Sequence, residues 1–78
     1  MKELVEFIAR SLVNDPMAVR VEEKDRGSKV FLKLHVAKDD MGRVIGKGGR
    51  VANAMRRLVN VAATREGKEA ELDIVDPQ

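Results

Sequence analysis

Three glycines gather around a lysine in the middle of the chain, in the run Gly46-Lys47-Gly48-Gly49. Glycine lets a backbone approach a phosphate without interference from a side chain, and free amides at the start of a helix favour an anion. Lys47 adds a positive charge at the same place, and Arg43 and Arg50 flank the loop. The pattern predicts a clamp for a sugar-phosphate backbone, with a tight turn between two helices as the alternative.

Two other phosphate-binding motifs fit this loop poorly. The Walker loop needs four residues between its first two glycines and a Ser or Thr directly after the lysine. Here three residues separate Gly42 from Gly46, and Gly48 follows Lys47. The dinucleotide fingerprint also fails, because no such glycine spacing follows a buried parallel strand of a repeated strand-helix unit. The loop therefore argues against a mononucleotide-binding enzyme.

Other polar residues offer no catalytic or metal-binding constellation. His35 stands beside Lys33 without a nearby group of Asp, Glu, Ser or Cys, so we expect no catalytic role for it. Asp39 or Asp40 is expected to cap a short helix, because a hard cation needs oxygens from several segments. Without a single cysteine, a thiolate metal site is impossible. We therefore predict that the chain is not an enzyme and uses neither a metal nor a cofactor.

Length and composition restrict the class of protein further. With 78 residues the chain has room for one hydrophobic core, so we expect a single domain over residues 1–78. Glu3, Glu6 and Arg10 interrupt the apolar amino terminus, which argues against a signal peptide, and we expect no membrane association. The lack of cysteine fits a reducing, cytoplasmic setting. A net charge of +2 tolerates a polyanionic partner without demanding one.

The spacing of apolar residues predicts the elements that must hold the glycine loop. Helices are expected over Glu3–Leu12, over Met41–Ile45 and from Arg50 to about Arg65, with Gly67 as a left-handed cap. Alternating apolar residues predict strands over 17–24, 29–36 and 69–74, the first two forming an antiparallel hairpin. A sheet with one apolar face needs helices to cover it. We therefore predict an α+β fold, a two-layer α/β sandwich whose three-stranded sheet is covered on one face by three helices.

The long predicted helix has two distinct faces. Its apolar stripe is expected to comprise Val51, Met55, Leu58 and Ala62, reinforced by Ala52 and Val59. Its polar face carries Arg50, Asn53, Arg57 and Asn60. This polar face either contacts the ligand of the loop or is simply solvated, and the pattern leaves both interpretations open. In the sheet, Val19, Leu32, Leu34 and Leu72 are expected to face the helices.

The run Ile45-Gly46-Lys47-Gly48-Gly49 resembles the I-G-x-x-G signature of KH domains. The order of elements, αββααβ, looks like the bacterial type II arrangement of that fold, and the resemblance covers nearly the entire chain. More narrowly, the stretch from Asp39 to Arg56 is similar to the KhpA family of small bacterial RNA-binding proteins. Those proteins are described as cytoplasmic RNA chaperones or regulators that often work with a larger KH-containing partner, KhpB.

The resemblance implies a groove in which a GXXG loop clamps four backbone nucleotides of single-stranded RNA. It places Gly46, Lys47, Gly48 and Gly49 at the phosphates. Val44 and Ile45 would lie near the groove floor, although both are also candidates for the core. Lys24, Arg26 and Lys29, in the turn of the predicted hairpin, would form the opposite rim. The other expected RNA contacts are Arg43, Arg50, Asn53 and Arg57.

Two functions follow from the resemblance. The first is an RNA chaperone or post-transcriptional regulator that binds single-stranded RNA, and the alternative is a KH-fold protein interaction module with RNA contact secondary. A clamp on four nucleotides discriminates at most about one sequence in 256. We therefore expect a homodimer or a KhpB-like partner that raises avidity. Phe7 and Phe31 are the only aromatic residues, which argues against recognition by stacked aromatic platforms of the RRM or OB type.

Overall fold

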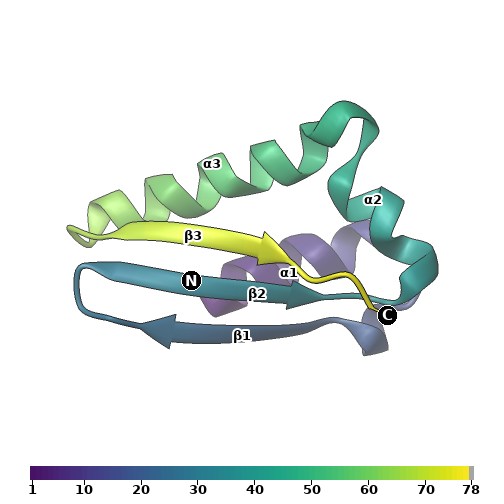
Figure 1. The fold of residues 1–78 in the computed structure, drawn as a ribbon, viewed down its shortest axis with the longest axis horizontal. Coiled ribbons are helices and arrows are strands. Elements are labelled where there is room, and N and C mark those ends of the chain that lie inside the picture. Colours follow the sequence, from purple (N-terminus) through teal and green to yellow (C-terminus); the bar gives the residue numbers. More distant parts are fainter. Residues whose placement is uncertain (78) are drawn as a thin grey trace.

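Three helices and three strands make up the computed structural model, which describes residues 1–77 (Figure 1). The helices are α1 (Lys2–Leu12), α2 (Met41–Ile45) and α3 (Arg50–Arg65). The strands are β1 (Arg20–Asp25), β2 (Lys29–His35) and β3 (Glu69–Ile74). Short 3-10 turns, η1 (Pro16–Ala18), η2 (Lys38–Asp40) and η3 (Lys47–Gly49), precede β1, α2 and α3 respectively. The predicted order of elements and the predicted fold class, an α+β two-layer sandwich, are confirmed.

The sheet has the strand order β1-β2-β3, with β1 antiparallel to β2 and β2 parallel to β3. A parallel pair requires a long crossover, which α2 and α3 supply. As a result, the α2–α3 loop lies at one end of the molecule and the β1–β2 turn at the other (Figure 1). The β1–β2 turn meets the α3–β3 turn, where Lys68 Nζ donates to Asp25 Oδ2 at 2.7 Å and lowers the pKa of that carboxyl.

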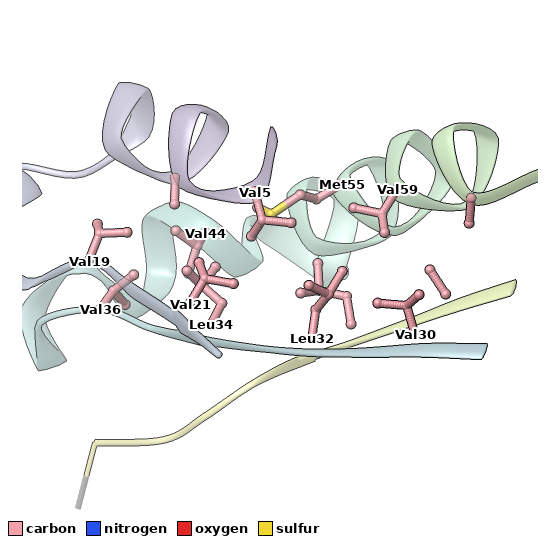
Figure 2. Close-up of a cluster of buried hydrophobic side chains, with 14 residues drawn as sticks. Val5, Val19, Val21, Val30, Leu32, Leu34, Val36, Val44, Met55 and Val59 are labelled. Carbon is pink, nitrogen blue, oxygen red and sulfur yellow. The ribbon is translucent and has the colours of Figure 1, made fainter. Parts of the chain in front are cut away.

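The core lies between the sheet and the helices, as Figure 2 shows. Val5 of α1, Val44 of α2 and Met55 of α3 are all at most 1% exposed and meet the inner face of the sheet. The four residues predicted to face the helices, Val19, Leu32, Leu34 and Leu72, are all buried. That part of the predicted core is confirmed. Packing of α1 and α3 against the strands holds α2, and with it the glycine loop, at one end of the sheet.

The start of the first strand differs from the prediction. Strand β1 begins at Arg20, whereas the alternation of apolar residues had suggested Met17. Pro16 instead opens the turn η1, because its ring holds φ in the helical range and it has no amide to donate to a strand. Met17 is consequently 92% exposed, although Val19 still reaches the core.

The buried stripe of α3 is confirmed in part, since three of its four residues were predicted, but it is rotated away from Leu58. Its buried residues are Ala52, Met55, Val59 and Ala63, while Leu58 is 52% exposed. Two stripes of similar apolar character run side by side on this helix, so periodicity alone could not choose between them. Alanine stands at both ends of the observed stripe, and these small side chains let α3 pack close to the sheet.

Candidate nucleic-acid interface

The glycine loop reverses the chain between α2 and α3 within four residues. Gly46 ends α2, where its amide donates to the Gly42 carbonyl at 2.8 Å, and the Gly49 amide donates to the Gly46 carbonyl at 3.1 Å. Gly46 and Gly48 have φ values of 75° and 65°, which residues other than glycine adopt only at a cost in free energy. The tight turn therefore requires glycine for its own conformation, apart from any need to admit a phosphate.

The space around the glycines separates a packed side of the loop from an open one. A Cβ atom on Gly46 would lie 2.5 Å from Val51 Cγ2 and 2.9 Å from Val51 N. A Cβ atom on Gly48 would meet no heavy atom within 4 Å. Gly46 thus packs against the first turn of α3, whereas Gly48 lies at the point where a ligand has free access to the backbone.

The first turn of α3 is suited to an anion. Gly49 is its N-cap and provides no side-chain cap, and the first turn contains no acidic residue. The Gly49 and Arg50 amides donate to the Gly46 and Lys47 carbonyls, so what the start of this 16-residue helix offers an anion is the positive end of its dipole. Lys47 and Arg50 are exposed and form no ion pair within residues 1–77. Arg43 Nε lies 3.6 Å from Asp40 Oδ1.

The structure distinguishes the two apolar residues that precede the loop. Val44 is 0% exposed and belongs to the core, so its side chain is not available to a ligand. Ile45 is half-buried and packs against the edge of the core. The prediction that both lie on the groove floor is therefore corrected: the accessible apolar side chain next to the loop is Ile45.

The remaining predicted contacts fall into two groups. Asn53 and Arg57 are exposed on α3, one and two turns beyond Arg50, and continue from the loop along the helix. Lys24, Arg26 and Lys29 lie at the opposite end of the molecule, in and beside the β1–β2 turn (Figure 1). Because α3 is about 24 Å long at 1.5 Å per residue, the structure does not bring these three cations together with the glycine loop.

Asp40 has a structural role that the sequence analysis missed. Its carboxylate is buried and accepts hydrogen bonds from the amides of Asn14 and Asp15, both at 3.0 Å. The predicted side-chain cap of α2 is wrong, because Asp40 forms no such bond to the helix. Asp40 instead ties the end of α1 to the start of α2 across 26 residues of sequence, a distance over which no local pattern signals the contact.

Removing this carboxylate should loosen the element that carries the loop. We expect Asp40→Ala to lower the free energy of unfolding by about 1–3 kcal/mol, since the amides of Asn14 and Asp15 lose their partner in a partly buried site. Thermal denaturation measures the loss. Asp39→Ala is the matched control, because Asp39 is exposed, and an equal loss in both variants would contradict the role given to Asp40.

Two side chains of α3 cover the free edge of β3. Arg56 Nε donates to the Leu72 carbonyl at 3.0 Å, and Asn60 Oδ1 accepts a hydrogen bond from the Ala70 amide at 3.2 Å. An uncovered edge strand is a template for pairing with another chain, so these contacts protect β3. Asn60, which the pattern placed on the polar face, therefore has a structural partner.

The family model of the KhpA/KhpB KH domain matches residues 2–74. Among similar curated proteins, the RNA-binding protein KhpA of Halalkalibacterium halodurans is 51% identical over 76 residues, which cover 97% of this chain and 100% of that protein. The RNA-binding protein KhpA of Clostridium perfringens is 48% identical, over 96% of this chain and all of that protein. That of Listeria monocytogenes EGD-e is 40% identical, over 97% of this chain and all of its own length.

A solved structure supports the fold independently. The crystal structure of Era in complex with MgGDPNP and nucleotides 1506–1542 of 16S ribosomal RNA matches 94% of this chain with a TM-score of 0.57. The sequence identity is 17%, and the match spans 28% of that chain, so the likeness concerns the fold of one part of Era. Within residues 1–77, no helix has the length and apolar character needed to cross a membrane.

Proposed function

The chain belongs to the KhpA/KhpB KH-domain family, and on that premise we propose that it binds single-stranded RNA through the Gly46–Gly49 loop. One observation carries the proposal: the backbone at Gly48 is open to a ligand directly in front of the uncapped, acid-free start of α3. Backbone amides and a helix dipole hold a phosphate without reading a base. The names of the relatives, which are RNA-binding proteins, support the same ligand.

The proposed clamp assigns a role to each side chain near the loop. Lys47 and Arg50 pair with phosphates beside the open backbone of Gly48, and Arg43 adds a third charge on the α2 side. Ile45 provides an apolar contact at the edge of the core. Asn53 and Arg57 continue the contact along α3 toward the next nucleotides.

We also propose the cellular role that the family resemblance implies. The chain acts in the cytoplasm as one KH unit, as an RNA chaperone or post-transcriptional regulator, and catalyses no reaction. The names of the relatives and the departure of the loop from the Walker spacing support this role.

A titration with RNA at several salt concentrations tests the clamp. Binding of a single strand should weaken with salt, with the logarithm of the affinity falling by about 0.7 per phosphate contact for each tenfold increase in salt. Single-stranded RNA should bind more tightly than a duplex of the same sequence, because the loop follows one backbone. Equal affinity for both, or binding that ignores salt, would argue for the interaction module in place of the clamp.

A pairing surface is the second proposal, and it rests on exposed apolar residues. Leu58 and Val61 lie one turn apart on the outer side of α3 and are 52% and 54% exposed. We propose that the chain pairs with a second copy or with a KhpB-like KH partner. Two clamps on one RNA raise avidity through effective concentration.

Leu58→Glu should separate pairing from RNA contact. We expect this variant to sediment as a monomer and to bind long RNA at least about tenfold more weakly, with no change on a tetranucleotide that occupies one clamp. Thr64→Glu, which adds the same charge at another exposed position of α3, is the control. If monomeric and paired forms bind long RNA equally well, pairing does not contribute to avidity.

A further inference from the structure

The face of the sheet opposite the helices is left uncovered within residues 1–77 (Figure 1). Its β1–β2 half holds an open cavity of about 420 Å³. The residues that line it are Glu22, Glu23, Lys24, Arg26, Phe31 and Lys33. Three of these six residues are cations, and Phe31 is one of the two aromatic residues of the chain. The clamp described above uses none of this surface.

The alternation of β2 places an aromatic ring on this outer face. Val30 and Leu32 are both 1% exposed and face the core, so Phe31 between them faces the other way. Lys24 lies directly opposite Phe31 in the β1–β2 register and therefore shares its face. Lys29 Nζ lies 5.3 Å from the centre of the Phe31 ring and forms a cation–π contact with it. The ring thus has Lys24 on its β1 side and Glu71, which lies 3.5 Å from Lys29 Nζ, on its β3 side.

The acidic residues of the cavity are already paired, whereas its cations are free. Glu22 Oε2 contacts His35 Nε2 and lies 3.6 Å from Arg20 Nη1. Glu23 Oε1 accepts a hydrogen bond from the Lys2 amide at 2.9 Å and lies 3.9 Å from the amino-terminal nitrogen.

The three cations that line the cavity form no ion pair with any residue of the described chain, 1–77. They are Lys24, Arg26 and Lys33. The cavity therefore presents three cations outside any ion pair beside an aromatic ring, with Lys33 facing Glu22 across the β1–β2 register.

We propose that this cavity is a second contact site for single-stranded RNA, in which a base stacks on Phe31 and the adjoining phosphates pair with Lys24, Arg26 and Lys33. The inference rests on the proposed function and extends it to a separate surface. Unpaired cations match the phosphates, and an aromatic ring matches a base, which is the combination that sequence-tolerant binding of single strands uses. An acidic peptide would satisfy the cations but leave the ring without a stacking partner.

The position of the cavity makes its contribution depend on the length of the RNA. The β1–β2 turn lies at the end of the molecule opposite the glycine loop (Figure 1). A strand held at the loop has to continue past the four clamped nucleotides, along a distance comparable to the roughly 24 Å of α3, before it reaches Phe31. A tetranucleotide should therefore occupy one site at a time, and a longer strand should occupy both.

Amide chemical shifts of the full chain, measured during titration with RNA, test the second site directly. A 20-nucleotide uridine-rich RNA should shift the amides of residues 46–50 and those of residues 22–33. Uridine monophosphate and a glutamate-rich peptide are titrated separately as the other occupants.

Matched variants then measure the contribution of the ring and of the charges. Phe31→Leu should bind the 20-nucleotide RNA about tenfold more weakly through loss of one stacked base, whereas Phe7→Leu, at an α1 residue that is 72% exposed, should not change the affinity. K24Q/R26Q should lower the salt slope by about 0.7 for each lost phosphate contact, and K2Q/R10Q removes equal charge from α1 as the control. Binding of the tetranucleotide at the glycine loop should be unchanged in all four variants.

The titration distinguishes a failure of the second site from a failure of the clamp at the glycine loop. Shifts at residues 46–50 without shifts at residues 22–33 would overturn the second site and leave the proposed function intact. Shifts at residues 22–33 alone would support the second site and refute the clamp. If the 20-nucleotide RNA shifts neither region, the proposed function fails together with the inference. Shifts of residues 22–33 by the peptide or the mononucleotide, but not by RNA, would assign the cavity to that ligand and overturn the proposal.

Discussion

Replacing both Lys47 and Gly48 with Asp is expected to abolish RNA binding and to leave the fold intact. The change removes a cation and puts two carboxylates at the positive end of the α3 dipole, where the proposed phosphate lies. Two like unit charges about 4 Å apart near a protein surface repel each other by about 4 kcal/mol, so affinity should fall at least about a hundredfold. A short RNA that covers the loop alone, titrated at constant salt, measures the loss.

The structure indicates that the double variant will fold. Asp at position 48 meets no atom within 4 Å of its Cβ, and Asp is among the residues that adopt a positive φ at modest cost. K2D/G67D is a matched control, because Gly67 also has a positive φ, 71°, and open space around its Cβ. Circular dichroism and thermal melting of both variants come before any titration. A folded K47D/G48D variant with parental affinity would remove the loop from the binding site.

Gly46→Ala is expected to cause the largest loss of stability among single changes in the loop. Its new Cβ would lie 2.5 Å from Val51 Cγ2 and 2.9 Å from Val51 N, and the backbone, at φ 75° and ψ 170°, is in a region used almost only by glycine. Strain of about 1–3 kcal/mol and overpacking of similar size add to roughly 2–6 kcal/mol. Because the free energy of unfolding of a small domain is only about 5–15 kcal/mol, thermal denaturation should show a large drop in the unfolding temperature.

Gly48→Ala provides the comparison for this prediction. It has a positive φ like Gly46 but no neighbour within 4 Å, so only the conformational cost of about 1–2 kcal/mol applies. The difference between the two variants therefore measures the contact with Val51 together with the rarer backbone region of Gly46, since Gly48, at φ 65° and ψ 18°, is left-handed helical. Equal destabilisation of the two would mean that the contact with the first turn of α3 contributes nothing.

Much of this protein is determined by its sequence at short range. The glycine loop, the helix that begins at Arg50 and the hairpin each follow from patterns within about a dozen residues, because helical and strand periodicity are local properties. The order of these elements and the I-G-x-x-G run were sufficient to indicate the fold and the family. The assignment of Gly46 to Arg50 as the RNA clamp remains a prediction, and the structure adds that this part of the chain is accessible.

Three features follow only from the way the helices and strands pack in the tertiary structure. Two apolar stripes compete on α3, and contact with the sheet selected Ala52, Met55, Val59 and Ala63, so Leu58 is exposed. The carboxylate of Asp40 finds its partners 25 and 26 residues away, beyond any local pattern. The parallel pairing of β2 and β3 makes α3 return along the sheet, so the β1–β2 turn meets the α3–β3 turn and not the glycine loop. A sequence pattern describes which residues share a face of one element, but packing between elements determines which faces meet and how far apart two basic segments lie.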